Sequence, residues 1–460
     1  MASFFEACQK VAEAFKKTNN INPIYIFSHF DADGITAASI LAASFSRIGF
    51  NFQIRILDRL DYSTLNHLDD TLPKDSTVIF SDIGTGVIDS FPQWKQTHEI
   101  FILDHHLPTS KIDFSGNITH LNPHNYSIDG ATEVSGAGVA YFVSININPQ
   151  NKHLAPLALI GALGDRQDQG EYSSMIGLNE FIVADAKKLN LISDNVSVWF
   201  FDRTRSIISI LKRIDLFDFE NELEIRAFLE KVGISFKKGD ELRSFYDLNI
   251  EETRRLASEL IVQYGIDPNE IYKKDYQLHL EKIDFLKDAR VFATNLNACG
   301  RIQRPDVGIS LCLGDRQSAL HELHSIKHEY SKLIAENIKW ALSEDRLQEL
   351  TAIHLLDGRE SINERMIGTI VSMLSSRKDL NPKPVLGCAL TTSGRIKISM
   401  RLPRHQDQQI DLGRLLNQVV EEVEPESEVG GHTAAAGAII SEKFLPDFID
   451  RVNQLVQEGF

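Results

Sequence analysis

The sequence is poor in cysteine, and its few cysteines are scattered: Cys8, Cys299, Cys312 and Cys388. No two of them form a CxxC pair, which argues against a disulfide framework and against a structural zinc site. No apolar run reaches the roughly 18 residues of a membrane span. The N-terminal segment carries Glu6 and Glu13 within a helical pattern and lacks the apolar core of a signal peptide. We therefore expect a cytoplasmic protein without a membrane partner.

Two common nucleotide-binding motifs are also missing. No GxxxxGK[ST] pattern occurs, so the chain is not a P-loop NTPase. Gly84 and Gly86 could begin a dinucleotide-binding loop, but Asp89 stands where that loop needs a third glycine. Basic residues are scarce as well, since 48 lysines and arginines face 64 acidic residues, for a net charge of −16. Taken alone, this surplus argues against a nucleic-acid partner, because phosphate binding requires a basic face.

The remaining composition is that of an ordinary folded protein, with 43% hydrophobic and 24% charged residues. A length of 460 residues suggests about three domains at about 150 residues each. The first part of the chain alternates short apolar runs with helical patterns. This alternation predicts right-handed βαβ units and a parallel sheet covered by helices. The expected strands are Ile24–Phe27, Phe52–Leu57, Val78–Phe80 and Ile100–Leu103.

The rest of the chain divides into three further parts. Charge-rich amphipathic patterns without a βαβ rhythm predict a helical insertion over 191–290. Residues 291–350 would complete the first domain and end in a long connector helix. Strand patterns return in 351–460, where we expect a smaller α/β domain. The predicted fold class is therefore α/β, with a parallel-sheet catalytic domain over 1–190, the insertion, the connector and the C-terminal domain.

Acidic and imidazole side chains follow each apolar element of the first domain. The first run is followed by Asp31 and Asp33, the third by Asp82, the fourth by Asp104-His105-His106, and an apolar helix by Asp165. The carboxyl ends of parallel strands share one edge, where ligands bind. We therefore expect these side chains to gather there. Taken singly, a DxDG segment is common in turns and Asp82 could be a helix N-cap.

Several buried aspartates at one edge would repel each other unless cations neutralise them. Carboxylate and imidazole ligands without thiolates suit Mn²⁺ or Mg²⁺. The number of ligands exceeds the needs of one ion and fits two divalent cations about 3.5–4 Å apart, the arrangement of many phosphoester hydrolases. We expect two divalent cations, with Mn²⁺ preferred over Mg²⁺.

The motifs resemble those of a known family. HFDADG, SDIGTG, LDHHLP and GALGDRQD resemble the four ordered motifs of the DHH phosphoesterase superfamily. GGHTAAAG near the C-terminus resembles the signature of the DHH-associated domain, and NACGR resembles a motif of RecJ nucleases. The whole pattern is similar to that of archaeal RecJ-like exonucleases of the GINS-associated nuclease type.

The resemblance implies roles for individual residues. His29 and Asp31 would bind one metal, and Asp33 would bind the other, while Asp82 would bridge both. His105 and Asp165 would complete the second metal's shell. Asp104 would orient His105, and His106 would face the scissile phosphate. In one departure, bacterial relatives place the first histidine four residues before the first aspartate, whereas His29 lies two before Asp31.

A locally basic stretch offers a place for the substrate. Residues 381–417 hold six lysines and arginines against two aspartates, a balance of +4. Arg395, Lys397, Ser399 and Arg401 alternate along a predicted strand and would share one face. The substrate-binding candidates are Arg301, Ser399, Arg401, Gly430, Gly431 and His432. The alternatives are an ordinary solvated strand face, a helix-terminal salt bridge for Arg301, and a structural turn for the glycines.

These observations favour a two-metal exonuclease that degrades single-stranded DNA or RNA to mononucleotides, in DNA replication or repair. One alternative is a phosphoesterase for short oligonucleotides or nucleotide phosphates, although a minimal two-domain enzyme would leave the insertion unexplained. The other is a replisome scaffold with a vestigial site, which the complete motif set opposes. Besides nucleic acid, GINS-like replisome proteins are expected partners. Polarity of digestion is left open.

Overall fold

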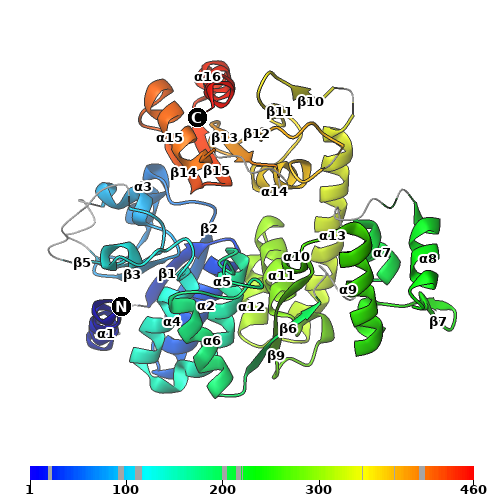
Figure 1. The fold of residues 1–460 in the computed structure, drawn as a ribbon. Coiled ribbons are helices and arrows are strands. Elements are labelled where there is room, and N and C mark those ends of the chain that lie inside the picture. The colour runs from blue at the N-terminus through cyan, green and yellow to red at the C-terminus, as the bar shows by residue number, and fades with distance from the viewer. Residues whose placement is uncertain are drawn as a thin grey trace. The chain divides into compact units, whose positions relative to one another are not determined.

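Five parallel strands form the centre of the N-terminal part of the chain in the computed structural model (Figure 1). Their order is β2-β1-β3-β4-β5, and every neighbouring pair is parallel. The strands are β1 (Ile24–His29), β2 (Phe52–Leu57), β3 (Thr77–Ser81), β4 (Glu99–Leu103) and β5 (Ile118–Leu121). The first four confirm the expected strands. The fifth was not predicted, because its sequence, ITHL, is short and half polar.

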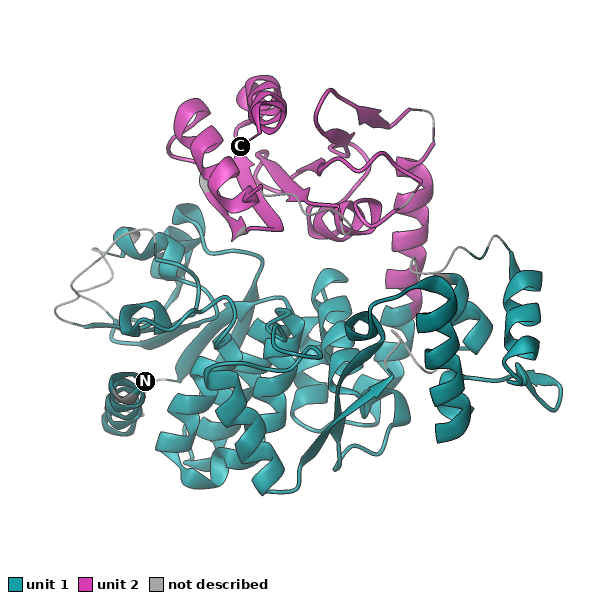
Figure 2. Cartoon of the chain, viewed as in Figure 1, with its two compact units in different colours: residues 1–327 teal, residues 328–460 magenta. Residues whose placement is uncertain are grey.

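The structure describes residues 1–18, 23–91, 98–108, 117–198, 205–213, 219, 221–343, 345–377, 379–403 and 410–459, with only the backbone for Ala2, Ser90, Glu428 and His432. The chain divides into two compact units, residues 1–327 and 328–460 (Figure 2). The four-part division expected from the sequence stays a prediction. Within the described residues, no helix combines the length and apolarity needed to cross a membrane.

Helices cover the sheet of unit 1. On one side, α2 (Ala32–Arg47), α4 (Gly136–Ile147) and α5 (Ala155–Gly164) pack against each other. They are apolar almost all round, as expected of helices enclosed by others. The other sheet face carries a second core that includes Phe27, Phe80 and α3 (Tyr62–Thr71). A short 3-10 helix, η1 (Thr85–Ser90), follows β3.

The insertion is mostly helical but is framed by two strands. After α6 (Leu178–Lys188), β6 (Ile192–Val198) pairs antiparallel with β9 (Tyr272–Leu278). Between them lie α7 (Ile207–Arg213), α8 (Glu222–Lys231), the short β7 (Lys237–Lys238) and β8 (Glu241–Leu242), α9 (Ile250–Tyr264) and α10 (Pro268–Ile271). The helices share an apolar core. The strand pair was not predicted, because ISDNVSV and YKKDYQL are too polar to stand out.

Two helices return the chain from the insertion to the helices that cover the parallel sheet. These are α11 (Ala289–Arg301) and α12 (Pro305–Cys312), and both pack on α2. The long helical pattern that follows is confirmed as α13 (Ser318–Ala341), although it ends earlier than expected.

Unit 2 holds a six-stranded mixed sheet in the order β10-β11-β12-β13-β15-β14. Its strands are β10 (Leu347–Glu349), β11 (His354–Asp357), β12 (Val385–Leu390), β13 (Ile396–Arg401), β14 (Glu428–His432) and β15 (Ala435–Ile440). The apolar side chains of α14 (Glu364–Leu374) form one core with β12. Those of α15 (Leu412–Val423) and α16 (Leu445–Glu458) form another. The expected α/β fold class is confirmed.

Candidate metal centre

Eight acidic and imidazole side chains gather at the carboxyl edge of the parallel sheet. They are His29, Asp31, Asp33, Asp82, Asp104, His105, His106 and Asp165. The first three lie at the end of β1, and the others except Asp165 directly follow β3 and β4. Asp165 directly follows α5, which packs on α2. The convergence expected from strand topology is therefore present.

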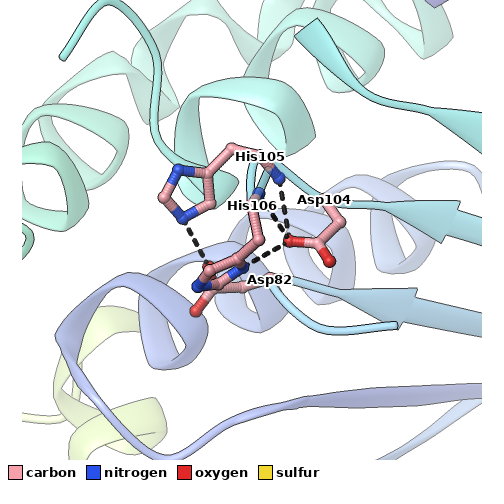
Figure 3. Close-up of side chains that lie close together, drawn as sticks. All are labelled: Asp82, Asp104, His105 and His106. Atoms are coloured by element: carbon pink, nitrogen blue, oxygen red, sulfur yellow. Dashed lines mark hydrogen bonds and ion pairs between the residues drawn. The ribbon is translucent and has the colours of Figure 1, made fainter. Parts of the chain in front are cut away.

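The ligand atoms fall into groups joined by Asp82. His29, Asp31 and Asp82 form one group, in which the Nδ1 of His29 lies 2.9 Å from Asp31 Oδ2 and 3.9 Å from Asp82 Oδ2. Asp33, His105 and Asp165 form another. The Nε2 of His105 lies 3.2 Å from the other oxygen of Asp82, which connects the two groups. Figure 3 shows His105 directed at Asp82.

Helix N-termini hold the two aspartates of the DxD segment. Asp31 caps α2, since its carboxylate accepts a hydrogen bond from the Gly34 N–H at 3.0 Å. Asp33 is buried and accepts the N–H groups of Gly136 and Ala137, at 2.6 and 3.0 Å, at the start of α4. Backbone N–H groups at the start of a helix can bind an anion, and at the Gly-Ala-Gly start of α4 the anion is the carboxylate of Asp33.

Asp82 occupies a strained position in the tightest part of the cluster. Its φ is +60°, a left-handed conformation that costs free energy for a residue other than glycine. A Cβ on Gly136 would lie only 2.6 Å from Asp82 Oδ1. Position 136 therefore admits no side chain while Asp82 keeps this place.

Asp104 holds His106 rather than the ring of His105. Its carboxylate accepts a hydrogen bond from the Nδ1 of His106 at 2.7 Å (Figure 3). It also accepts one from the backbone N–H of Thr85 at 2.9 Å. It reaches His105 only through the backbone N–H. The Nδ1 of His105 instead bonds the carbonyl oxygen of Gly130 at 2.6 Å. The expectation that Asp104 orients His105 is therefore wrong, because the His105 ring points away from Asp104 toward Asp82.

Burial and mutual repulsion set the charges of the cluster. Burial, reinforced by the neighbouring charges of Asp33 and Asp31, raises the pKa of Asp82 well above its ordinary value. Burial and the Asp33 carboxylate raise the pKa of Asp165 to about 7. Burial opposes charge on His105, but the carboxylates of Asp165 and Asp33 outweigh it and raise the pKa of His105 to about 9.

The donor set fits divalent cations. Among the described residues, three buried atoms of the cluster make no hydrogen bond: the Nδ1 of His29, Oδ1 of Asp82 and Nε2 of His105. Buried polar atoms that make no hydrogen bond are costly, and the two ring nitrogens lie 2.9 Å from Asp31 Oδ2 and 3.2 Å from Asp82 Oδ1, carboxylate oxygens that a cation would share. Carboxylates and imidazoles without thiolate are the donors that Mn²⁺ and Mg²⁺ accept.

The sequence reasoning missed residues that support this edge from α11. The side-chain oxygen of Asn297 accepts the Ala32 N–H at 3.0 Å, between Asp31 and Asp33 in the chain. A Cβ on Gly300 would lie 1.8 Å from the carbonyl oxygen of Phe30, so the helix touches the backbone of the DxD segment directly. Both residues belong to the NACGR segment, whose interpretation considered only Arg301. Arg301 is the last residue of α11 and is half-buried.

The candidates for substrate binding in unit 2 differ in their surroundings. Ser399 and Arg401 share one face of β13, and the Arg401 guanidinium donates to Ser399 Oγ at 3.1 Å. Arg401 also donates to the Met400 carbonyl at 2.8 Å, and Arg395 donates to Ser427 Oγ and to the Ile439 carbonyl. Lys397 is half-buried.

The two glycines, Gly430 and Gly431, also differ in their surroundings. A Cβ on Gly430 would meet nothing within 4 Å, whereas one on Gly431 would lie 2.4 Å from Ala436 Cα. Gly431 is therefore required by packing within the sheet. The side chain of His432 lies outside the described part, as do two charged residues of the basic stretch, Arg404 and Asp407.

Comparison with known proteins identifies both ends of the chain. Residues 23–162 match the DHH family, N-terminal domain, and residues 350–458 match the DHHA1 domain. An uncharacterized protein of Methanocaldococcus jannaschii is 29% identical over 465 residues, which cover 98% of this chain and 97% of that protein.

Two solved structures show the same fold. RecJ from Thermus thermophilus, in complex with Mn²⁺, matches with a TM-score of 0.58 at 20% identity, over 99% of this chain. The present chain spans only 55% of that RecJ chain. CDC45 from Entamoeba histolytica matches with a TM-score of 0.63 at 13% identity, over 98% of this chain and 99% of that one.

Proposed function

The chain belongs to the DHH family and has a RecJ-like fold, and from this premise we propose that it is a two-metal exonuclease. It would hydrolyse the phosphodiester bonds of single-stranded DNA or RNA to mononucleotides, in DNA replication or repair. The observation that carries the proposal is the cluster at the sheet edge, where the Nδ1 of His29, Oδ1 of Asp82 and Nε2 of His105 are buried without hydrogen bonds.

The grouping of the ligand atoms supports two cations, with Mn²⁺ preferred over Mg²⁺. His29 and Asp31 would hold one, Asp33, His105 and Asp165 the other, and Asp82 would contact both. Bound divalent cations supply Lewis-acid stabilisation of the phosphate charge and make water a better nucleophile at neutral pH. The protein's part is to fix the donors in advance through the start of α4, the cap of α2 and the carbonyl of Gly130.

His106 is the residue best suited to meet the substrate. Its side chain is 57% exposed, whereas Asp104 behind it is 1% exposed. Desolvation lowers the pKa of His106, but the Asp104 carboxylate outweighs this and raises it to about 9. The ring is therefore cationic at neutral pH, and its second nitrogen can donate to a phosphate oxygen. Asp104 and His106 together would act as the catalytic pair.

Unit 2 would bind the nucleic-acid backbone. Ser399 and Arg401 on β13, the open Gly430, Gly431 and His432 are the proposed contacts, together with Arg301 of unit 1. An arginine fits phosphate through its planar fork of donors. The net charge of −16 confines such binding to limited parts of the surface, so we expect modest and salt-sensitive affinity.

Two other functions are weaker. A scaffold with a vestigial site has no need for the complete set of donors at the sheet edge. A phosphoesterase for short oligonucleotides or nucleotide phosphates would use the same cluster but leaves the large insertion without a role.

The insertion itself is the proposed docking part for a GINS-like protein. It exposes Leu223, Ile250 and Val262 at 74%, 71% and 81%. Exposed aliphatic side chains are common on proteins, so these three do not by themselves establish a docking surface. The test is deletion of the insertion, followed by co-purification with GINS-like proteins. Binding that survives the deletion contradicts it.

The decisive experiment uses single-stranded DNA and RNA labelled at the 5′ or 3′ end, with Mn²⁺ or Mg²⁺. We expect release of mononucleotides by the wild-type protein and none by Asp82→Ala. The choice of labelled end reports polarity. If no substrate is degraded in a manner that depends on Asp82, the enzyme proposal is wrong. Degradation of short oligonucleotides alone favours the second function.

A further inference from the structure

The carbonyl oxygen of Gly130 lies between two buried side chains. It accepts a hydrogen bond from the Nδ1 of His105 at 2.6 Å and another from the side-chain amide nitrogen of Gln167 at 2.8 Å. Gln167 is 0% exposed and His105 5%. A Cβ on Gly130 would lie 1.9 Å from the His105 carbonyl oxygen, so only glycine lets the two backbone segments approach this closely. The His105 ring is therefore fixed by a carbonyl that has a second, independent anchor.

Gln167 is held in turn by Asn179 at the start of α6. The Asn179 amide nitrogen donates to Gln167 Oε1 at 2.8 Å, and its backbone N–H donates to the Glu133 carbonyl at 2.8 Å. Asn179 is 1% exposed. A left-handed turn at Arg166, with φ +58°, brings Gln167 back toward α5, where its N–H bonds the Ala162 carbonyl. Hydrogen bonds thus run from Asn179 through Gln167 to Gly130.

The direction of these bonds fixes the chemistry at His105. Because Asn179 donates to Gln167 Oε1, the Gln167 amide presents its NH₂ group to Gly130. The Gly130 carbonyl is an acceptor only, so the His105 Nδ1 must carry a hydrogen. Loss of the second proton, from Nε2, then leaves a lone pair on the side of the three carboxylates, where a cation would take the place of that proton. That nitrogen lies 3.2 Å from Asp82, 3.3 Å from Asp165 and 3.7 Å from Asp33.

We infer that Gln167 and Asn179 are positioning residues that set the orientation and tautomer of His105 and thereby the affinity of the cation held by Asp33, His105 and Asp165. The inference rests on the metal centre of the proposed function. Partners that orient a metal-bound histidine typically change metal affinity about 10–100-fold when they are replaced. The hydrogen bonds of this chain join Asn179, Gln167, Gly130 and His105 and do not include His29 or Asp31, so we expect the larger effect on the cation of the His105 group.

The test is titration of the metal-free full-length protein with Mn²⁺ in a calorimeter. Gln167→Met keeps the side chain's length but removes its hydrogen bonds, and Asn179→Ala removes the donor behind it. Asp165→Asn and Asp31→Asn identify which binding step belongs to which group. We expect Gln167→Met to weaken about tenfold or more the Mn²⁺ binding step that is sensitive to Asp165→Asn. The step that is sensitive to Asp31→Asn should be unchanged. Asn179→Ala should act in the same direction.

Two controls separate positioning from a general loss of stability. Asn151 is another fully buried amide of unit 1, and its side chain donates to the Ser144 carbonyl at 2.9 Å. Asn151→Leu should lower thermal stability and leave both Mn²⁺ steps intact. The double variant of Gln167 and Asn179 should bind no more weakly than Gln167→Met alone, because both residues act through one carbonyl.

The outcomes are distinct. Equal affinities in wild type and both variants, or equal weakening of both steps, would overturn the positioning role. Should Gln167→Met not fold, Asn179→Ala and the milder Gln167→Asn give the same comparison. A wild-type protein that binds no Mn²⁺ would overturn the proposed metal centre itself, a result that is separate from unchanged affinity in the variants.

Discussion

The Oδ1 of Asp104 and the Nδ1 of His106 lie 2.7 Å apart, in a hydrogen bond between a buried carboxylate and a largely exposed ring. The same carboxylate accepts backbone N–H groups of Thr85, His105 and His106. Asp104 is therefore held in place by several hydrogen bonds. It fixes the orientation of the His106 ring and raises the pKa of that ring, which keeps it positively charged. This pair leads to the first prediction.

Replacement of Asp104 by Asn should reduce kcat about 100-fold, because His106 loses its anionic partner and with it the positive charge of its ring. Both Mn²⁺ binding steps should remain, since Asp104 turns its carboxylate toward His106. His106→Gln should give a similar loss, and the double variant should be no slower than either single one. Nuclease kinetics and calorimetry on the same preparations measure this. Full activity in Asp104→Asn contradicts it.

Replacement of Asp82 by Asn should abolish hydrolysis while leaving the metal-free fold at least as stable as wild type. Burial and the neighbouring carboxylates disfavour a charge at position 82, and Asn carries none. Without metal, the melting temperature should be equal to or above that of wild type. With Mn²⁺, wild type alone should gain stability, because a cation that binds the folded state stabilises it. A large loss of stability in metal-free Asp82→Asn would argue for a structural role.

A methyl group at Gly136 should displace Asp82 and disrupt the cluster, because the added Cβ would lie 2.6 Å from Asp82 Oδ1. We expect Gly136→Ala to lose activity and Mn²⁺ affinity together. The matched control is Gly86→Ala, since a Cβ there meets nothing within 4 Å. Calorimetry compares the two variants. Unaltered Mn²⁺ binding by Gly136→Ala would mean that the helix start can shift without cost.

Mn²⁺ binding should release protons in a manner that depends on pH. In the metal-free protein, the pKa of Asp165 is about 7 and that of His105 about 9. Below pH 7 a cation must displace protons from both groups, and between pH 7 and 9 from His105, besides any proton held by Asp82, whose pKa is also raised. Apparent affinity should therefore rise as pH rises through this range. Calorimetry in buffers of different ionisation enthalpy counts the released protons. Asp165→Asn should abolish the change in proton release near pH 7. Release that does not change with pH contradicts this.

Loss of Arg401 should weaken substrate binding without affecting the metals. Arg401→Ala is expected to raise KM for single-stranded DNA about tenfold, the effect of losing one charge-assisted hydrogen bond. Arg395→Ala is the matched control, because its guanidinium serves Ser427 and the Ile439 carbonyl. It should lower thermal stability more than it raises KM. An unchanged KM in Arg401→Ala contradicts the substrate-binding role.

Much of the catalytic fold could be predicted from local patterns. The buried strands β1, β3 and β4 are apolar runs, and each is followed by the acidic residues of the cluster. Polar strands were missed, because β6 and β9 lack an apolar alternation and are stabilised by pairing across a long stretch of sequence. Register between such distant segments is decided by tertiary packing.

The sequence by itself determined which donors meet, because parallel strands bring their carboxyl ends to one edge whatever the details of packing. It could not determine how each donor is held. Whether Asp104 bonds His105 or His106 depends on ring orientation, which the carbonyl of Gly130 decides. Asn297, Gln167 and Gly136 act across long separations in the chain, and only the tertiary structure brings them to the site. The alternation of strands and helices is a local and repetitive pattern of the sequence, whereas hydrogen-bond partners are determined by proximity in three dimensions.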